Sequence, residues 1–174
     1  MIRLDTFTES DFSRLISWIS SREMLMQFGG PLFIYPLTTH QLTIYCTEQN
    51  RFPFKVIDDS LNKVIGHAEI FLPEKQKAVF CRLLIGDSAE RNKGYGSQLV
   101  QKLLGICFVE MDIQEINLNV YDWNKNAIRC YEKAGFQINE GKTRKTVIND
   151  QEWTALNMII SKPQWMNHSK SHHI

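Results

Sequence analysis

Hydrophobic residues along this chain recur with two different periods, which separate the predicted helices from the predicted strands. The short run at residues 2–4 alternates apolar and polar side chains, which is typical of a strand. Behind the polar group at residues 8–11, residues 12–19 carry apolar side chains at helical spacing. Residues 37–39 supply a start for a second helix, over residues 39–45. The chain is therefore expected to open with one strand and two helices.

From residue 52 onward the period changes to that of strands. Two apolar stretches, 54–57 and 64–70, flank a polar turn at residues 58–62, and this arrangement predicts a β-hairpin. A third strand is expected over residues 78–85. The middle of the chain therefore contributes neighbouring strands to one sheet.

The second half of the chain holds two places where a strand is followed by a helix. The strand at 78–85 leads through a glycine-containing loop to a helix whose apolar face spans residues 99–108. The alternating strand at 116–120 leads to a second helix at 125–134. No repeat or linker interrupts the pattern, so we expect an α+β chain with a single domain over residues 1–163.

The helix predicted at residues 125–134 has marked ends. Asn124 is a good N-cap, and Gly135 suits the left-handed residue that ends a helix. In that geometry Phe136 can contact Tyr131, which lies in the last turn. We therefore expect the helix end to help fix the direction of the Tyr131 side chain.

The C-terminal part predicts a last pair of strands followed by a tail. Residues 146–148 and 153–160 flank a turn at residues 149–150. The tail at 164–174 is polar and is expected to be frayed and flexible.

Composition narrows the class of protein. The 174 residues are 43% hydrophobic and 22% charged, with a net charge of +1, which is typical of a globular domain and disfavours a general nucleic-acid surface. The four cysteines form no metal-binding pair, so we expect reduced thiols, no metal and a cytoplasmic location. We expect that the N-terminal residues are not a signal peptide, and we expect no membrane span, since no apolar stretch approaches the roughly 20 residues that one needs.

The loop at residues 91–96 is the first candidate for chemistry. A helix start leaves backbone N–H groups without partners and favours an anion. Gly94 and Gly96 allow close approach, while Arg91 and Lys93 add positive charge. These features favour a phosphate-binding site, although an ordinary strand-to-helix turn with solvated basic side chains would have the same residues. A dinucleotide-binding fingerprint is disfavoured, because Leu99 stands where the third glycine belongs.

Two motifs together resemble those of the GNAT superfamily of N-acetyltransferases. Residues 91–96 resemble the family's acetyl-CoA loop, in which an Arg or Gln precedes two spaced small residues. Residues 118–136 resemble its second cofactor segment, with Asn124, Ala127, Tyr131 and a Gly-Phe pair at the family's spacing. The resemblance extends over nearly the whole chain and is firmest over residues 78–136.

The resemblance implies the acyl-CoA N-acyltransferase fold. That fold has a mixed, mostly antiparallel central sheet with helices on both faces, splayed between the strands that would here end at Ile85 and Tyr121. Acetyl-CoA would be the co-substrate, with no metal. The implied cofactor-binding residues are Leu83, Leu84, Ile85, Arg91, Asn92, Lys93, Gly94, Tyr95, Gly96, Ser97 and Asn124.

The resemblance also implies the reaction, in which a primary amine attacks the thioester directly. Tyr131 is the expected general acid for the leaving thiolate. The general base is open, because Arg82 stands where many members of the family place an acid. Glu69 on the neighbouring strand is one candidate, His67 is another if that strand is regular, and a chain of waters is a third.

The acceptor stays open between a small-molecule amine and a protein or peptide amine. Residues 148–153 resemble the subset that includes ribosomal-protein and spermidine acetyltransferases. Five aromatic residues could line an acceptor pocket or belong to the core: Trp18, Phe28, Phe33, Tyr35 and Trp153. A homodimer is compatible with this sequence. The competing hypothesis is a non-catalytic acyl-CoA-binding module that kept the fold without the base.

Overall fold

The computed structural model describes residues 1–171 and contains one seven-stranded sheet in the order β1-β2-β3-β4-β5-β7-β6. The pair β4–β5 is parallel, whereas β1–β2, β2–β3, β5–β7 and β6–β7 are antiparallel. The expected mixed, mostly antiparallel α+β sheet is therefore confirmed. The strands are β1 (Ile2–Thr6), β2 (Arg51–Asp58), β3 (Lys63–Glu74), β4 (Lys77–Ile85), β5 (Glu115–Tyr121), β6 (Gln137–Ile148) and β7 (Gln151–Ser161).

The chain divides into two compact units. Residues 1–71 and 81–95 form what we call the N-terminal unit, and residues 72–80 together with those from 96 onward form the C-terminal unit. The expectation of one domain over residues 1–163 stays a prediction. Within the described residues, no helix has the length and apolar character to cross a membrane.

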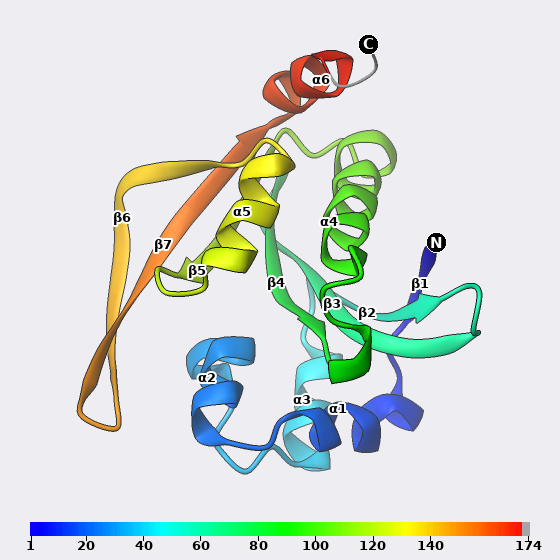
Figure 1. Cartoon of the computed structure of the whole chain (residues 1–174), viewed down its shortest axis with the longest axis vertical. Helices are drawn as coiled ribbons and strands as arrows, with labels where there is room; N and C mark the ends of the chain where they lie inside the picture. The colour runs from blue at the N-terminus through cyan, green and yellow to red at the C-terminus, as the bar shows by residue number, and fades with distance from the viewer. Residues whose placement is uncertain (172–174) are drawn as a thin grey trace. The chain divides into compact units, whose positions relative to one another are not determined.

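Three helices of the N-terminal unit lie together in Figure 1, in blue and cyan: α1 (Phe12–Trp18), α2 (Arg22–Gly29) and α3 (Thr39–Thr47). The cap predicted for α3 is confirmed, because the Thr38 side chain accepts a hydrogen bond from the backbone N–H of Gln41. Helix α2 was not among the predicted elements. Its signal was Ser21, whose hydroxyl accepts from the N–H of Met24 at 3.1 Å.

The side chains between these helices and the strands form the core of the N-terminal unit. Their exposed fractions are 7% or less, so the unit has an apolar interior of its own. Both Phe28 and Phe33 belong to it, which assigns these two acceptor-pocket candidates to the core. The core residues are Phe7, Phe12, Leu15, Ile19, Leu25, Phe28, Phe33, Leu37, Leu42 and Tyr45.

Two helices alternate in sequence with strands in the second half of the chain. Helix α4 (Tyr95–Gly105) lies between β4 and β5, and α5 (Lys125–Lys133) lies between β5 and β6. The apolar face predicted for residues 99–108 is confirmed: its six apolar side chains are at most 2% exposed. The parallel ladder of β4 with β5 pairs residues 77–80 with residues 115–118.

The predicted ends of α5 are confirmed. The Asn124 side chain accepts a hydrogen bond from the N–H of Ala127 at 3.3 Å. At the other end Gly135 has a φ of +99°, and the N–H of Phe136 donates to the carbonyl of Tyr131 at 3.0 Å. The rings of Phe136 and Tyr131 meet edge to face with centroids 6.1 Å apart, as expected.

The end of the chain differs from the expected frayed tail. Residues Lys162–Ser171 form helix α6, which follows the long hairpin of β6 and β7 in Figure 1. Its start is a capping box, in which the Gln164 side chain accepts from the N–H and hydroxyl of Ser161. Trp165 then packs on Phe108, with ring centroids 5.2 Å apart. The part of the tail prediction that concerns residues 172–174 lies outside the described residues.

Candidate active site

Strand β4 is kinked at Arg82, directly before the residues expected to contact the acetyl group. Arg82 has a φ of +53°, in the left-handed region that non-glycine residues rarely adopt. Such a conformation costs on the order of 1–3 kcal/mol and persists only where the surroundings hold it. The contacts of Arg82 therefore decide how residues 83–85 are presented.

A buried ionic cluster surrounds the guanidinium of Arg82, and we call it the Glu69 cluster: Tyr45, Arg51, His67, Glu69 and Arg82. Its centre is the carboxylate of Glu69, whose side chain is fully buried. That carboxylate accepts hydrogen bonds from Nη1 of Arg51 at 2.8 Å, from Nη2 of Arg82 at 2.7 Å and from the Tyr45 hydroxyl at 2.5 Å, and Nε of Arg82 also donates to it. Both carboxylate oxygens are therefore occupied.

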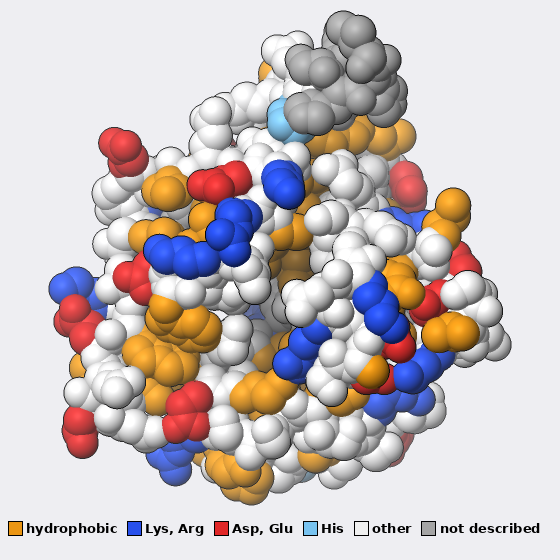
Figure 2. Space-filling view, viewed as in Figure 1, with side chains coloured by type: hydrophobic (Ala, Val, Ile, Leu, Met, Phe, Trp, Pro, Cys, Tyr) orange, Lys and Arg blue, Asp and Glu red, His pale blue; other side chains and the backbone are white. Residues whose placement is uncertain are grey.

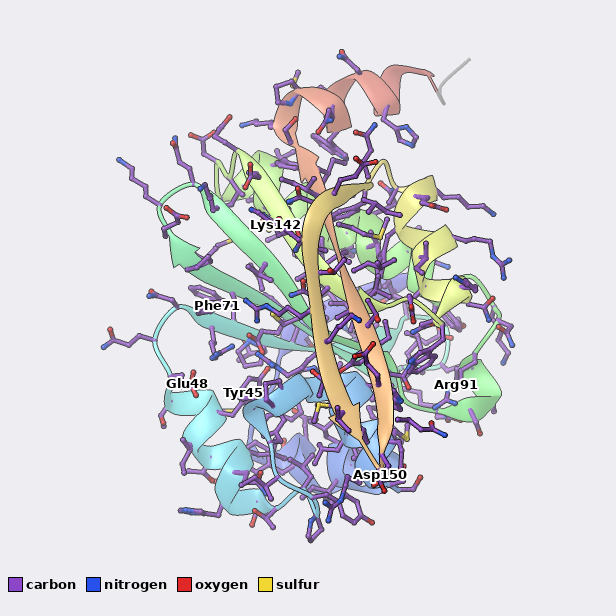
Figure 3. The ribbon with its side chains drawn as sticks, turned by 90° about the vertical axis from the view of Figure 1, so that its left-hand side faces the viewer. Tyr45, Glu48, Phe71, Arg91, Lys142 and Asp150 are labelled. Atoms are coloured by element: carbon purple, nitrogen blue, oxygen red, sulfur yellow. The ribbon has the colours of Figure 1, made fainter. Side chains whose placement is uncertain are left out.

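Aromatic rings surround the positive charge of this cluster, which holds two guanidinium groups and one carboxylate. The Arg51 guanidinium lies 4.4 Å from the centroid of the Phe71 ring. Figure 3 shows Phe71 near Glu48, the residue that follows α3. The Arg82 guanidinium lies 5.1 Å from the Tyr45 ring. Arg51 also pairs with Glu48. Ring faces attract cations, so these contacts offset part of the cost of burying the second guanidinium.

The side chain of His67 holds the other end of Arg82. Its Nδ1 lies 3.0 Å from the carbonyl oxygen of Arg82, and because a carbonyl can only accept, this nitrogen carries the hydrogen. Burial lowers the pKa of His67 to about 4, so the ring is neutral near pH 7. Glu69 and His67 therefore anchor the side chain and the carbonyl of Arg82 and hold the kink.

The surroundings of Glu69 weigh against its predicted role as the general base. Burial alone would raise the pKa of Glu69, but the hydrogen bonds and charge of Arg82, with those of Tyr45 and Arg51, outweigh it and lower the pKa. His67 is equally unsuited, because its pKa is low and its ring is buried. The Tyr45 hydroxyl lies near both residues, so they do share a face of β3, as expected for a regular strand.

The glycine loop follows β4 and keeps its basic side chains in internal contacts. The Nε of Arg91 donates to the carbonyl of Ile85 at 3.1 Å and Nη2 donates to that of Gly86 at 3.2 Å. The Nζ of Lys93 donates to Glu90 at 2.9 Å. Neither side chain is simply solvated, and contacts of either one with cofactor phosphates stay a prediction.

The backbone of the loop is open. Asn92 and Gly94 have φ values of +63° and +82°. Apart from Gly94 itself and its two chain neighbours, no atom of the described residues lies within 4 Å of the place where a Cβ on Gly94 would stand. At Gly96 the nearest such atom is the sulfur of Cys130 at 3.9 Å. An anion can therefore approach these backbone N–H groups closely.

The Tyr95 side chain anchors the same loop to β2. Its hydroxyl donates to the carboxylate of Asp58, which also accepts from the N–H of Ser60 at 2.8 Å. These hydrogen bonds lower the pKa of Asp58, and the bond to Asp58 raises the pKa of Tyr95 to about 12. The Tyr95 ring is therefore a fixed support for the loop.

In the C-terminal unit the start of α4 meets α5. The Ser97 hydroxyl lies 3.6 Å from the sulfur of Cys130, the residue before Tyr131. Tyr131 is half-buried, and its hydroxyl has no hydrogen-bond partner within residues 1–171. Burial raises the pKa of Tyr131 above its usual range, so the hydroxyl keeps its proton near pH 7.

The predicted site residues thus fall in both units. The N-terminal unit brings residues 83–85 to residues 91–95 through the Arg91 side chain. The C-terminal unit brings Ser97 to α5, which begins after Asn124. Sequence reasoning missed Tyr45 and Arg51, because only folding brings them to Glu69.

An open cleft of about 490 Å³ lies beside the end of β4 within the N-terminal unit. Trp18, a candidate acceptor-pocket residue, forms part of its wall. A Cβ on Gly86 would stand 2.0 Å from the Trp18 ring, so this position requires glycine. The lining residues are Ser17, Trp18, Ser20, Met24, Gly86, Asp87, Ser88 and Arg91.

The molecular surface mixes both signs of charge. On the face in Figure 2, Lys and Arg side chains lie among those of Asp and Glu, in keeping with a net charge of +1. The described residues contain no group of three or more His, Cys, Asp or Glu side chains suited to hold a metal ion.

Comparison with known proteins places this geometry in a family. Residues 18–136 match the model of the acetyltransferase (GNAT) family. The chain is 30% identical over 100 residues to an uncharacterized SPbeta prophage-derived N-acetyltransferase, YokL, of Bacillus subtilis, and this match covers 58% of the chain and 55% of that protein. It is 23% identical over 155 residues to an aminoglycoside N(6')-acetyltransferase type 1 of Klebsiella pneumoniae, covering 78% of this chain and 74% of that one.

Solved structures share the fold. A spermidine N-acetyltransferase from Vibrio cholerae, in complex with CoA and spermine, has a TM-score of 0.80 at 20% identity and covers 95% of this chain and 98% of its own. Another structure of that enzyme is dodecameric. The aminoglycoside acetyltransferase AAC(6')-Ib in complex with coenzyme A has a TM-score of 0.73 at 19% identity. The match covers 96% of this chain and 98% of that chain. The family model matches well over half of the 174 residues of this chain. The chain therefore belongs to the acetyltransferase (GNAT) family of acetyl-CoA-dependent enzymes.

Proposed function

We propose that this protein transfers the acetyl group of acetyl-CoA to a primary amine. The observation that carries the proposal is the doubly anchored kink at Arg82, which leads through residues 83–85 into an open glycine loop at the start of a helix. Strained backbone held in place by its surroundings is characteristic of functional sites. Membership of the GNAT family supplies the cofactor.

Backbone groups would do most of the cofactor binding. Residues 83–85 would contact the pantetheine and the acetyl carbonyl, and N–H groups within residues 92–97 would hold the pyrophosphate. The open space over Gly94 and Gly96 supports this assignment. Asn124 caps α5, and we assign it a cofactor contact in addition.

The acetyl transfer itself is a direct displacement. The neutral amine nitrogen attacks the carbonyl carbon, so that a C–N bond forms while the C–S bond breaks. Tyr131 gives its proton to the departing sulfur, and the proton released from nitrogen restores the tyrosine through solvent. The half-buried hydroxyl, which has no hydrogen-bond partner among the described side chains, supports this role.

The acceptor must lose a first proton before it can attack. A lysine-like amine has a pKa of about 10.4, so near pH 7 it arrives charged. We assign that proton to water rather than to Glu69, whose lowered pKa and saturated oxygens make it a weak base. His67, with a pKa of about 4, is also too weak.

A small-molecule amine is the acceptor class that we favour. Its support comes from the names of similar proteins, which include aminoglycoside and spermidine acetyltransferases. A cytoplasmic location is supported by the four free cysteines. An oligomer, such as a homodimer, is supported by the dodecameric state of the Vibrio cholerae enzyme.

The competing function, a non-catalytic acyl-CoA-binding module, is favoured by the poor bases at positions 67 and 69. One measurement tests the cofactor binding that the two hypotheses share, and a second separates them. Acetyl-CoA in large excess should raise the melting temperature under both, because it binds the native state. Thiol release over a panel of polyamines, amino sugars, amino acids and peptides should occur only with the enzyme.

Variants make this test specific to the loop. Gly94→Val, which places a branched side chain at a φ of +82°, should abolish the acetyl-CoA shift. Gly105→Ala is the control, because a Cβ on this helical glycine would meet no atom beyond its own stretch of helix backbone, and it should keep the shift. If acetyl-CoA in large excess left the melting temperature of the wild-type protein unchanged, both functions would be refuted.

A further inference from the structure

Three aromatic rings of the C-terminal unit form one cluster at the end of β5 and the start of β7. Tyr121 and Trp123 are stacked, with centroids 5.7 Å apart and planes inclined by 3°. Trp153 meets both of them edge to face, at 4.9 Å from Tyr121 and 5.1 Å from Trp123. We call Tyr121, Trp123 and Trp153 the aromatic platform.

The platform is not part of the core. Trp123 is 44% exposed, and the other two rings are half-buried. The three rings contact one another through their faces and edges, but these contacts do not involve the Tyr121 hydroxyl or the two indole N–H groups. The Tyr121 hydroxyl and the two indole N–H groups have no hydrogen-bond partner anywhere in the described part of the chain. The surface therefore offers three polar tips beside exposed aromatic rings.

Negative charge accompanies these rings. Asp122 lies between Tyr121 and Trp123 in the chain and forms no ion pair with any described residue. Glu152 precedes Trp153, is 54% exposed and is paired with Lys145. Aromatic faces and carboxylates both attract cations, so the local chemistry suits an ammonium-bearing ligand.

The free N–H donors restrict the ligand further. An indole N–H can only donate, so it needs an oxygen or another acceptor on the ligand. A linear polyamine that is fully protonated has cations but no acceptor. An amino sugar or aminocyclitol has ammonium groups for the carboxylates, hydroxyl oxygens for the indoles and C–H faces that stack on aromatic rings.

The platform is also continuous with the proposed catalytic segment. Asn124 follows Trp123 directly, and its N–H donates to the carbonyl of Tyr121 at 2.9 Å. Asn124 then caps the helix that carries Tyr131. A ligand seated on these rings would thus be held by the same turn that begins α5.

We propose that the aromatic platform binds the acceptor, and that this acceptor is an amino sugar or aminocyclitol rather than a linear polyamine. This inference rests on the proposed acetyltransferase function.

Kanamycin, glucosamine and spermidine serve as probes of the platform. Binding is followed by indole fluorescence without cofactor, and turnover by thiol release with acetyl-CoA. We expect kanamycin to quench the wild-type signal and Trp123→Ala to raise its KM by about tenfold or more. Trp123→Phe, which keeps a ring and loses the N–H, should show a smaller rise. The KM for spermidine should change less in both variants.

Controls separate the platform from the enzyme. Val109→Ala, at an exposed position outside the platform, should leave every value unchanged. The acetyl-CoA melting shift should be the same in all variants, since Trp123 has no assigned cofactor contact. Quenching without turnover of any amine would leave the binding surface standing and refute the proposed function.

Two results would overturn the inference about the platform. One is turnover of amines with a KM for kanamycin that is unchanged in Trp123→Ala. The other is a KM for spermidine that rises as much as the KM for kanamycin, because the ligand would then be recognised by charge alone.

Discussion

The Glu69 cluster of the N-terminal unit and the aromatic platform of the C-terminal unit combine similar side chains in opposite ways. In the cluster, rings surround ionic groups, and both oxygens of Glu69 are occupied. In the platform, rings pack on one another and the polar tips have no partner within residues 1–171. Satisfied polar groups hold backbone in place, whereas unsatisfied ones near the surface remain available to a ligand.

Two tyrosines repeat this contrast. Tyr45 is 1% exposed, and its hydroxyl donates a hydrogen bond to the Glu69 carboxylate at 2.5 Å. Tyr131 is half-buried and donates to no described residue. Burial raises the pKa of both hydroxyls. The two hydroxyls therefore share the direction of their pKa shift and differ in whether a described residue holds them.

The largest expected effect tests whether the Glu69 cluster is structural. Among the described residues, Glu69 is the acid that pairs with the buried guanidinium of Arg82. Glu69→Gln removes this charge, so we expect a loss of about 3–5 kcal/mol in the free energy of unfolding. Urea denaturation measures it. Glu74→Gln, in an exposed pair with Lys77, is the control and should change stability by less than about 0.5 kcal/mol. Equal effects of the two substitutions would contradict a structural role for the cluster.

The second prediction concerns pH and His67. The pKa of this group is about 4 in the folded protein and about 6.5 when unfolded, so the unfolded chain binds more protons between these values. The contribution is fully present above pH 6.5 and is lost as pH falls to 4, amounting to about 3 kcal/mol. Urea denaturation across this range measures the slope. His67→Asn, which keeps a donor but cannot titrate, should flatten it, and an unchanged slope would rule out His67 as the cause.

The third prediction separates the two tyrosines. Tyr131→Phe should lower kcat by about 100-fold or more, because the thiolate loses its acid. It should change the free energy of unfolding by less than about 1 kcal/mol, since the lost hydroxyl has no partner among residues 1–171.

Tyr45→Phe is the matched comparison, because it removes the hydrogen bond to Glu69. We expect it to cost about 1–3 kcal/mol of stability, measured by the same denaturation. Reversed outcomes, with activity dependent on Tyr45 and stability on Tyr131, would invert the comparison between the two regions.

The smallest expected effect concerns the cap of α5. Asn124→Ala should lower the free energy of unfolding by about 1 kcal/mol, because the N–H of Ala127 loses its acceptor. Asn124→Asp, which can still cap, should restore stability. Measuring the acetyl-CoA melting shift in both variants then tests the cofactor contact: a shift retained in both would limit Asn124 to capping.

Local sequence was sufficient wherever neighbours in the chain decide the structure. The apolar face of α4 follows from helical spacing, and the ends of α5 follow from Asn124 and Gly135. Two helices were missed although their caps are local. Ser21 begins α2, and the Ser161–Gln164 capping box begins α6. Those misses were errors of interpretation, because the sequence carried both signals.

The sequence by itself therefore determined the order of the main elements, the two cofactor motifs, the glycine loop and the placement of Tyr131 on α5. Only the tertiary structure decided what Glu69 does. Its partners come from α3, β2 and β4, and no pattern in the sequence shows that they converge. The physical reason is that a carboxylate's pKa and accessibility depend on charges and hydrogen bonds that folding brings together. The same holds for the aromatic platform, because Trp153 joins Tyr121 and Trp123 only through the pairing of β5 with β7.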